Sequence, residues 1–348
     1  MKPVRIGSER CGYVRVGYGL PCVVMAEVGL NHDGDIGKAL DLVHLAVEAG
    51  ADLVKFQYID PPAMVHRESM PELYSLYGKY ALSVAEIQRV ARACEDRKIP
   101  LVCTVFDLEG AARMVELGVQ AFKVASCDMT HLPLLKGLGV FGLPVILSTG
   151  LSDIGEVAKS VRALKQGGCK SPILLHCVSA YPAPADQVNL SAMLTLQRKF
   201  RLPAGFSDHT SGTLAPALAA VLGAAMVEKH FTRDPGAQGP DHALSLGPQD
   251  FRKMVEWVRL ASAMRGDGRK KCAPVERQER KTGRRGFYLA RDVKAGEKVR
   301  LSDLTALKPW TEIGPFDLKV LRGASYAKNL KAGSPLNSGD ILPAEKNP

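Results

Sequence analysis

The feature of this sequence that most restricts its fold is a pattern of strand, loop and helix, repeated eight times between Pro21 and about Met264. Each repeat opens with a short apolar segment, as expected for a strand buried on both faces, and continues into an amphipathic helical pattern. The predicted strands are Val23–Val28, Leu53–Gln57, Leu101–Phe106, Ala121–Ala125, Val145–Ser148, Ile173–Cys177, Ala204–Ser207 and Met226–Phe231. Helical patterns between them include Gly37–Ala49, Val84–Arg97, Ile154–Leu164 and Leu214–Leu222. Eight units over about 245 residues favour an α/β fold, a (β/α)8 TIM barrel, over a doubly wound sheet.

The sequence changes character after these repeats. From Arg265 to Arg285 there are nine basic and three acidic residues, so +6 of the formal net charge of +10 lies in this stretch. We expect a barrel domain at residues 1–264 that begins with a hairpin in residues 3–20, then a solvated basic linker at 265–283. Residues 284–348 are predicted to form a small domain of short strands and turns. Its strand-like pieces are Phe287–Ala290, Lys294–Lys298, Gly314–Phe316, Gly333–Pro335 and Ser338–Asp340.

Composition and charge exclude several classes of protein. The basic residues of the linker are not interleaved with aromatic residues, so no nucleic-acid partner is expected. The longest apolar run, Leu214 to Val227, is shorter than the ~20 residues of a membrane span, and no secretion signal is seen. The eight cysteines contain no CxxC pair, which favours reduced thiols. We therefore expect a cytoplasmic enzyme without a membrane partner.

Polar side chains gather at the carboxyl ends of all eight predicted strands. One strand-end lysine or histidine is most often solvated or structural, but barrel enzymes build their active sites at this end, and eight consecutive polar ends favour a site. The lysines Lys55 and Lys123 suit an anionic substrate that carries phosphate and carboxylate groups. The hydroxyls that would complete the shell of this anion are Thr104, Ser126, Ser148 and Ser207.

The histidines and acidic residues indicate a metal and proton transfer. His209 and His230 end adjacent strands, so they could share Mn²⁺ or Mg²⁺ with positions left for water and substrate. Such an ion polarises a carbonyl as a Lewis acid. Carboxylates that could bind sugar hydroxyls or move protons are Glu27, Asp128 and Asp241. Three further histidines are interpreted as supporting or structural, namely His32, His176 and His242.

Several strings resemble the sialic acid synthase (N-acetylneuraminate synthase) family. They are AEVGLNHDGDIGKAL, GADLVKFQ, KVASCDMTHLPLL, PVILSTGLSDIGEV, LLHCVSAYPAPADQVNL, GFSDHTSG and VEKHFTRDPGAQGPDH. Beyond the linker, RRGFYLARDVKAGEKVRLSDLTALKP resembles that family's antifreeze-like (SAF) domain. The resemblance implies a transferase that uses Mn²⁺ or Mg²⁺ to condense phosphoenolpyruvate with N-acetylmannosamine or a related open-chain aldehyde sugar. Phosphate leaves by C–O cleavage. It also implies a domain-swapped homodimer in which the SAF domain of one chain covers the barrel of the other.

The same resemblance assigns roles by position. His209 and His230 match the metal ligands, and Glu27 matches the acidic residue beside the reacting carbons. The residues that match phosphoenolpyruvate ligands are Lys55, Thr104, Lys123, Ser126, Ser148 and Ser207. Those that match the surroundings of the sugar and the metal-bound water are Gln57, Asp128, Tyr181 and Asp241.

Some positions depart from the family's commoner pattern. Ala125 and Cys127 stand where the sialate-forming branch often has glycines, and Gly286 stands where a serine usually follows two arginines. Lys308 precedes Pro309 where an arginine is expected to reach the N-acetyl group, and lysine lacks the planar fork of arginine. These departures do not touch the residues that match phosphoenolpyruvate and metal ligands. They bear on the identity of the sugar, so legionaminic or pseudaminic acid synthesis stays open, with Lys308 as the expected sugar contact.

Two alternative functions remain open from the sequence. Lys123 or Lys55 could form a Schiff base in an aldolase or lyase, which requires a desolvated lysine and no metal. A non-catalytic sugar-binding protein could use the same fold, because fold alone does not determine function. The histidine pair and the set of hydroxyls favour the synthase over both.

Overall fold

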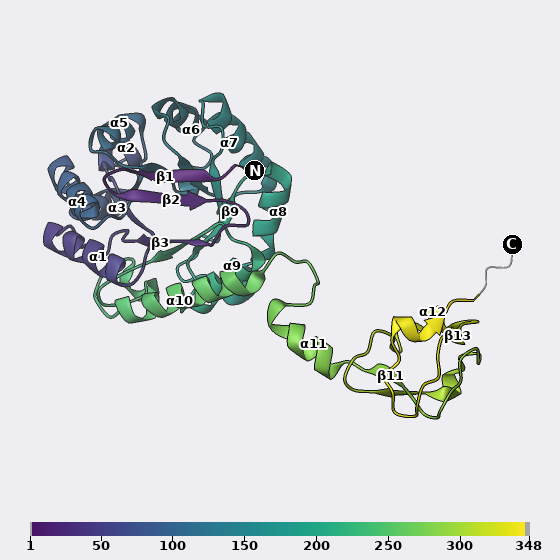
Figure 1. Ribbon diagram of the computed structural model, residues 1–348. Coiled ribbons are helices and arrows are strands. Elements are labelled where there is room, and N and C mark those ends of the chain that lie inside the picture. The colour runs from purple at the N-terminus through teal and green to yellow at the C-terminus, as the bar shows by residue number, and fades with distance from the viewer. Residues whose placement is uncertain (1, 345–348) are drawn as a thin grey trace. The chain divides into compact units, whose positions relative to one another are not determined.

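A computed structural model describes residues 2–344 of the chain. The chain divides into two compact units, Met1–Gly268 and Arg269–Pro348. The first unit contains a closed barrel of eight parallel strands in the order β10-β3-β4-β5-β6-β7-β8-β9, which confirms the predicted TIM barrel (Figure 1). The strands are β3 (Val23–Glu27), β4 (Leu53–Gln57), β5 (Leu101–Thr104), β6 (Ala121–Val124), β7 (Val145–Ser148), β8 (Ile173–Cys177), β9 (Ala204–Asp208) and β10 (Met226–His230).

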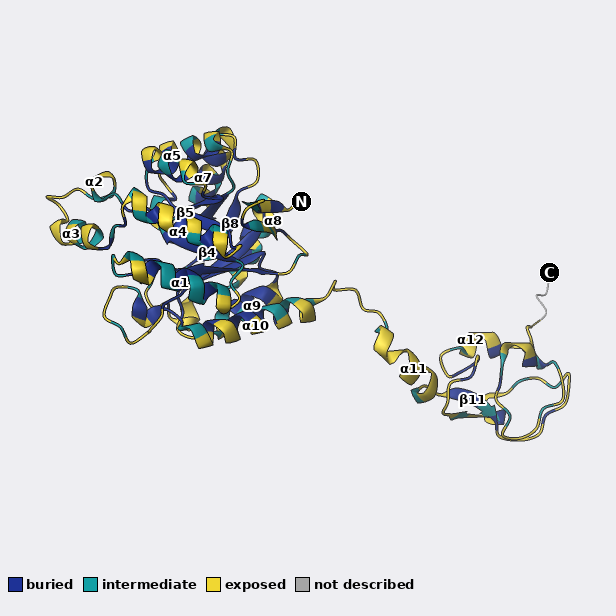
Figure 2. Cartoon of the chain, turned by 60° about the vertical axis from the view of Figure 1, so that its left-hand side comes forward, coloured by how far each residue is buried: buried dark blue, intermediate teal, exposed yellow. Residues whose placement is uncertain are grey.

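Helices surround the barrel, with buried inner faces and exposed outer faces (Figure 2). They are α1 (Ile36–Glu48), α4 (Val84–Asp96), α5 (Leu108–Glu116), α6 (Leu132–Leu138), α7 (Ile154–Gln166), α8 (Ser191–Phe200), α9 (Leu214–Leu222) and α10 (Pro248–Arg265). Their starts follow capping chemistry, because Ser83 with Glu86 and Asp153 with Glu156 form capping boxes at α4 and α7. Two helices that the sequence did not predict, α2 (Pro61–Met64) and α3 (Pro71–Tyr80), lie in the connection from β4 to α4.

The N-terminal hairpin closes one end of the barrel. Strands β1 (Val4–Ser8) and β2 (Gly12–Val16) pair antiparallel, as the sequence predicted for residues 3–20. Their inner side chains Val4, Ile6 and Val16 pack in one buried cluster with the first inward-facing residues of the barrel strands, such as Met25 and Leu53. Parallel strands begin at this end, so the opposite end is left for the site.

The second unit has its own small core. Strand β11 (Gly286–Leu289) pairs with β12 (Leu304–Leu307), β13 (Ser325–Tyr326) pairs with β14 (Ile341–Leu342), and helix α12 spans Leu318–Leu321. The buried side chains of this core are Phe287, Leu289, Val293, Ile313, Leu321, Tyr326 and Leu336.

Most of the strands predicted in the second unit are wrong. Only Phe287–Ala290 corresponds to a strand. Lys294–Lys298, Gly314–Phe316 and Gly333–Pro335 are turns or isolated bridges, and Ser338–Asp340 is a 3-10 helix. Pieces of three to five residues carry too little alternation for their period to be read, and here tertiary contacts decide the conformation.

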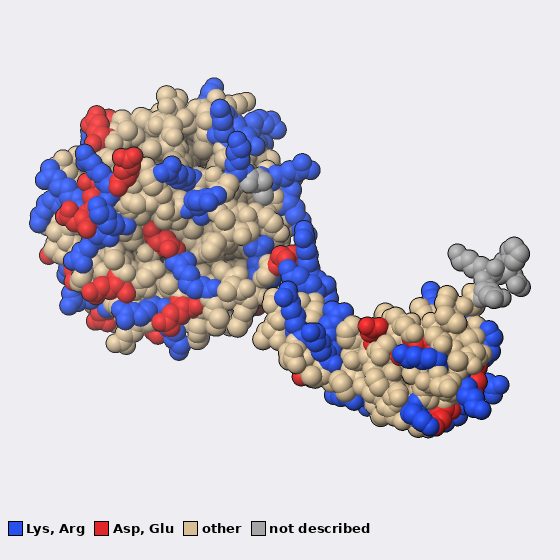
Figure 3. Space-filling view, viewed as in Figure 1, with Lys and Arg blue, Asp and Glu red and all other residues tan. Residues whose placement is uncertain are grey.

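The basic segment between the barrel repeats and this core is partly helical. A 3-10 turn at Pro274–Glu276 leads into α11 (Arg277–Gly283), and neither element has a buried residue. Lysine and arginine side chains gather along this segment (Figure 3). Over the part of the chain described here, no helix is long and apolar enough to cross a membrane.

Candidate active site

A cavity of 390 Å³ opens at the carboxyl end of the barrel strands. Twelve of the fourteen predicted site residues line it: Glu27, Lys55, Gln57, Thr104, Lys123, Ser126, Ser148, Tyr181, Ser207, His209, His230 and Asp241. Two do not. Asp128 lies in the 3-10 turn Ser126–Asp128, where it accepts a hydrogen bond from Cys127 (3.4 Å), and Lys308 is an exposed residue of the second unit.

The strand alternation and register explain why these residues meet. Side chains two residues apart on a strand point to the same face, and neighbouring strands are paired nearly level. Glu27 pairs with Lys55, and Thr104 pairs with Lys123. Ser207 pairs with Glu228, a residue that the sequence analysis did not select. The ends of strands that are distant in sequence therefore form one polar ring.

Two buried lysines and two buried glutamates form the floor of this ring. Lys55 Nζ lies 3.2 Å from Glu27 Oε1 and forms a shorter ion pair with Glu228 Oε1. Lys123 Nζ donates to Ser148 Oγ (2.7 Å) and lies 3.8 Å from Glu228 Oε2. Glu228 thus contacts both cations. Its spacing of two residues from His230 was the available signal, because residues i and i+2 of a strand share one face.

The electrostatics of the two glutamates differ. Burial raises the pKa of Glu27 to about 7, although the charge of Lys55 opposes this. Burial also favours the neutral form of Glu228, but Lys123 and Lys55 outweigh it and lower the pKa of Glu228 to about 2. Glu228 is therefore the permanent counter-ion, whereas Glu27 can gain or lose a proton near neutral pH. Gln57 Nε2 orients Glu27 by donating to Oε1 (2.7 Å).

The imidazoles of His209 and His230 lie side by side, with ring centroids 5.5 Å apart. His209 Nδ1 lies 2.8 Å from the carbonyl oxygen of Val178, so it donates there and leaves Nε2 with a lone pair. His230 Nδ1 has no hydrogen-bond partner and lies 3.7 Å from Asp241 Oδ2. Burial lowers the pKa of His230 to about 4, which keeps this imidazole neutral at physiological pH. Burial disfavours the charged form of His209, but the contacts with Cys177 and the Val178 carbonyl outweigh it and raise the pKa of His209. A neutral imidazole with a free lone pair, as His230 provides, is the form that binds metals.

The donor set at this position fits a divalent cation with an open coordination shell. Within residues 2–344, no group of three or more His, Cys, Asp or Glu side chains is arranged to hold a metal. Two imidazoles would leave positions for water and substrate oxygens, as suits Mn²⁺ or Mg²⁺ better than structural zinc.

The loop after β3 brings Asp241 into the site. Gly29 has a positive φ of 54°, and a Cβ atom at this position would lie 2.6 Å from Asp241 Oδ2. The amide of Leu30 donates to the same oxygen (3.1 Å). Glycine at position 29 thus allows the Asp241 carboxylate to approach the backbone of this loop and His230.

One wall of the cavity is apolar. It is formed by Leu30, Leu73, Leu76, Phe106 and Ala125, with Tyr77 beside them. Leu73, Leu76 and Tyr77 come from α3, and their spacing puts them on one helix face. We call this surface the apolar wall. This wall was not predicted from the sequence, because α3 lies in a connection rather than at a strand end.

The three histidines interpreted as structural lie outside the cavity. His32 Nδ1 accepts from the amide of Gly34 (3.1 Å), and a nitrogen of His176 lies 2.7 Å from the Val188 carbonyl oxygen. His242 contacts Thr232 Oγ1 (2.7 Å) and Asp33 Oδ1 (3.1 Å). Each imidazole is thus already used to hold a loop.

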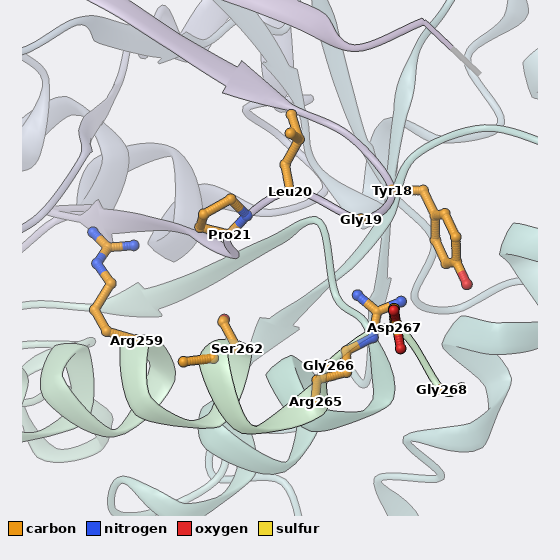
Figure 4. A pocket seen from close by; sticks show the side chains of 11 residues that line it. Tyr18, Gly19, Leu20, Pro21, Arg259, Ser262, Arg265, Gly266, Asp267 and Gly268 are labelled. Carbon is orange, nitrogen blue, oxygen red and sulfur yellow. The ribbon is translucent and has the colours of Figure 1, made fainter. Parts of the chain in front are cut away.

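A larger cavity of 730 Å³ lies at the opposite end of the barrel, between residues 18–21 and the end of α10 (Figure 4). The guanidinium of Arg259 is already engaged there, because it donates to the Cys22 carbonyl oxygen (2.7 Å) and to Asp52 Oδ1 (2.6 Å). Arg265 lies over the ring of Tyr18. This cavity lacks the histidines and the buried lysines, and its end of a barrel serves stability.

The barrel and its ring of lysines, hydroxyls, histidines and carboxylates define a class, a TIM-barrel enzyme for an anionic substrate. Residues 42–270 match the family model described as NeuB family, and the chain belongs to this family. An uncharacterized protein of Methanocaldococcus jannaschii is 41% identical over 321 residues, which cover 92% of this chain and 93% of the relative.

Two named relatives agree with this assignment. The N,N'-diacetyllegionaminic acid synthase of Legionella pneumophila is 36% identical over 336 residues, covering 92% of this chain and 94% of the relative. The crystal structure of N-acetylneuraminic acid (sialic acid) synthetase from Leptospira borgpetersenii superposes with a TM-score of 0.73 and 33% identity. That match covers 80% of this chain and 95% of the other. This chain is a sugar-acid synthase of the kind that condenses phosphoenolpyruvate with a sugar.

Proposed function

We propose that this enzyme condenses phosphoenolpyruvate with an open-chain 2,4-diacetamido-2,4,6-trideoxyhexose, an N-acetylated aldehyde sugar, to make an acid of the legionaminic type. The observation that carries the proposal is that the apolar wall lines the same cavity as the charged ring. This sugar has three methyl groups, two on its acetamides and one at C6, whereas N-acetylmannosamine has one methyl and a C6 hydroxyl. Burying each additional methyl against apolar side chains contributes about 0.8 kcal/mol. The 36% identity to a diacetyllegionaminic acid synthase supports the same choice.

The charged ring suits phosphoenolpyruvate. Lys55 and Lys123 are both buried, so a phosphate or carboxylate would meet them without intervening water. Glu228 balances them until the substrate arrives, which lowers the cost of holding two cations together. The hydroxyls of Thr104, Ser126, Ser148 and Ser207 complete the shell. The buried Thr104 Oγ1 has no partner in the protein, as expected of a donor that waits for a ligand.

The reaction requires two bonds to form and one to break. C3 of phosphoenolpyruvate bonds to the aldehyde carbon, and the aldehyde oxygen takes up a proton. Water then adds to C2 and loses one proton, which leaves a hydroxyl at C2. The C2–O bond to phosphate breaks as this hydroxyl loses its proton, and the products are the ketone and phosphate. Glu27, with a pKa of about 7, is the carboxyl suited to accept or donate a proton beside these carbons. A divalent cation held by His209 and His230 would polarise the aldehyde as a Lewis acid.

The test is phosphate release from phosphoenolpyruvate with Mn²⁺ and a panel of acceptors, with product masses recorded. The panel contains N-acetylmannosamine, its 6-phosphate, and the diacetamido-trideoxyhexoses of the legionaminic and pseudaminic routes. We expect the legionaminic precursor to give the highest kcat/KM and a product mass equal to sugar and pyruvate joined. A preference for N-acetylmannosamine by tenfold or more would reject the trideoxyhexose. Borohydride trapping of pyruvate on Lys123 would instead revive the Schiff-base aldolase.

We also propose that the second unit is an antifreeze-like (SAF) domain that covers the barrel of a partner in a swapped homodimer. Its exposed aromatic side chains support this, since Phe316 is fully exposed and Trp310 is 46% exposed. Exposed aromatic residues are enriched at protein interfaces. Light scattering is expected to give twice the chain mass, and a monomer at micromolar concentration would reject the dimer.

A further inference from the structure

A buried ion pair lies directly behind the two candidate metal ligands. Asp208 and Lys229 are fully buried, and Lys229 Nζ donates to Asp208 Oδ2 at 2.7 Å. They are level with each other on the neighbouring strands β9 and β10. Because side chains alternate along a strand, this pair is on the outer side of the barrel wall, whereas His209 and His230, the next residues on each strand, point into the cavity.

The pair also fixes the backbone on the far side of His209. Asp208 Oδ1 accepts from the amide of Thr210 (2.8 Å), and Lys229 Nζ donates to the carbonyl oxygen of Thr210 in a short contact. The carbonyl of His209 itself accepts from the amide of Ala183 (2.9 Å). The backbone that follows this imidazole is therefore held at three points, and the Lys229 side chain ties it to the strand that carries His230.

Stability alone does not account for this ion pair. Two charges lose their hydration when they are buried, and apolar residues of similar volume often stabilise a protein equally well or better. A buried ion pair does, however, impose one geometry on the elements that it joins. Partners that hydrogen-bond metal-ligating side chains typically tune metal affinity by 10–100-fold, and this pair acts on the ligands one step further out, through the backbone.

We propose that Asp208 and Lys229 are positioning residues that set the separation and orientation of the His209 and His230 imidazoles for a divalent cation. The inference rests on the proposed metal-dependent function. It assigns a role to two side chains that touch neither substrate nor metal, and the pair acts by keeping the ends of β9 and β10 at a fixed offset.

The experiment compares two double variants. Asp208→Asn/Lys229→Met removes both charges while Asn can still accept from Thr210. The matched control, Asp52→Asn/Arg259→Met, removes an ion pair that also binds backbone groups, the Val24 amide (2.7 Å) and the Cys22 carbonyl (2.7 Å), but at the opposite end of the barrel. Mn²⁺ affinity is measured by electron paramagnetic resonance of free Mn²⁺, and folding by circular dichroism and thermal unfolding.

We expect Asp208→Asn/Lys229→Met to weaken Mn²⁺ binding about tenfold or more while the control binds as the unchanged protein does. Raising Mn²⁺ to saturation is expected to restore most of kcat, which a general loosening of the fold would not allow. A folded variant whose Mn²⁺ Kd stays within twofold of the unchanged protein would overturn the inference. If the double variant does not fold, Asp208→Asn alone is used, because it keeps the shape of the side chain. It is also expected to weaken Mn²⁺ binding, and an unchanged Kd would overturn the inference.

The starting protein separates this inference from the function on which it rests. Failure of the unchanged protein to bind Mn²⁺ would reject the metal site and this inference together. A second outcome is that the unchanged protein releases phosphate and binds Mn²⁺, and the folded variant does both equally well. This outcome would reject the positioning role alone.

Discussion

The two ends of the barrel interior carry different kinds of side chain, although the same eight strands form both. At the N-terminal end, the inward-facing side chains are apolar and the hairpin covers them. At the carboxyl end, they are charged or hydroxylated and surround a cavity. Burying charge costs free energy, whereas burying apolar surface stabilises the fold. The comparison indicates that one end of each strand provides stability and the other provides chemistry, so mutations at the two ends should have separable effects.

The largest effect is expected from His209→Ala at the carboxyl end. Under the proposed function, loss of one of the two metal ligands would remove the Lewis acid, worth several kcal/mol at the transition state, so kcat/KM for phosphate release should fall by about 10³-fold or more. The variant should stay folded. His176→Ala is the control, because that imidazole holds the Val188 carbonyl outside the cavity and its loss should leave Mn²⁺ binding intact. Full turnover of His209→Ala in metal-free, chelator-treated buffer would remove the metal from the mechanism.

Ile6→Ala in the hairpin is expected to do the opposite, lowering the stability of the fold while leaving kcat/KM nearly unchanged. Ile6 is fully buried against the N-terminal end of the barrel, and such a truncation costs about 2–5 kcal/mol of unfolding free energy. Because the site is at the other end, kcat/KM per folded molecule should change by less than about twofold. Urea unfolding and initial rates measure the two quantities, and Arg15→Ala on the exposed side of the hairpin serves as the control. A large loss of kcat/KM at unchanged folded fraction would show that the two ends are coupled.

A smaller effect is expected from Glu27→Gln, which should alter how the free energy of unfolding depends on pH. The folded protein raises the pKa of Glu27 from 4.5 to about 7, so it binds this proton more tightly than the unfolded chain does. Glu27 therefore favours the fold fully below about pH 4.5, and this contribution is lost as the pH rises through about 7. The metal-free protein should lose unfolding free energy between pH 5 and pH 8 as Glu27 ionises. In Glu27→Gln this loss should be smaller by on the order of 2 kcal/mol.

The exposed carboxylate Glu116 provides the control for this titration, as Glu116→Gln. Urea unfolding at several pH values should give curves of the same shape for the control and the unchanged protein. An unaltered pH dependence in Glu27→Gln would mean that Glu27 is already ionised at pH 5, so it could not exchange a proton near neutrality.

The smallest effect is expected from Lys308→Ala, which tests a residue predicted from sequence position alone. Lys308 is exposed, so its loss should change unfolding free energy by less than about 0.5 kcal/mol. If it contacts the sugar, KM for the sugar should rise about threefold to tenfold while KM for phosphoenolpyruvate stays the same. Equal KM values for both substrates in the variant and the unchanged protein would exclude Lys308 from the sugar site.

The sequence was informative where its pattern was long and regular. Eight repeats predicted the barrel, and strand-end residues such as Lys55 and His209 were predicted because parallel strands bring their carboxyl ends together. Glu228 was missed although its spacing from His230 puts both on one face of the strand, because its partners Lys55 and Lys123 come from strands distant in sequence. The role of α3 was missed because a helix in a connecting segment obeys no strand periodicity. The strand predictions in the second unit were mostly wrong because strand pairing there depends on residues distant in sequence, such as Ser325 with Leu342.

Condensation with C–O cleavage can be followed through the bridging oxygen of phosphoenolpyruvate. The enzyme is given phosphoenolpyruvate with ¹⁸O between C2 and phosphorus, Mn²⁺ and the diacetamido-trideoxyhexose of the legionaminic route. We expect the released phosphate to keep the label and the product mass to equal sugar and pyruvate joined. Unlabelled phosphate, with ¹⁸O left in free pyruvate, would mean P–O cleavage without condensation and would reject the proposed reaction.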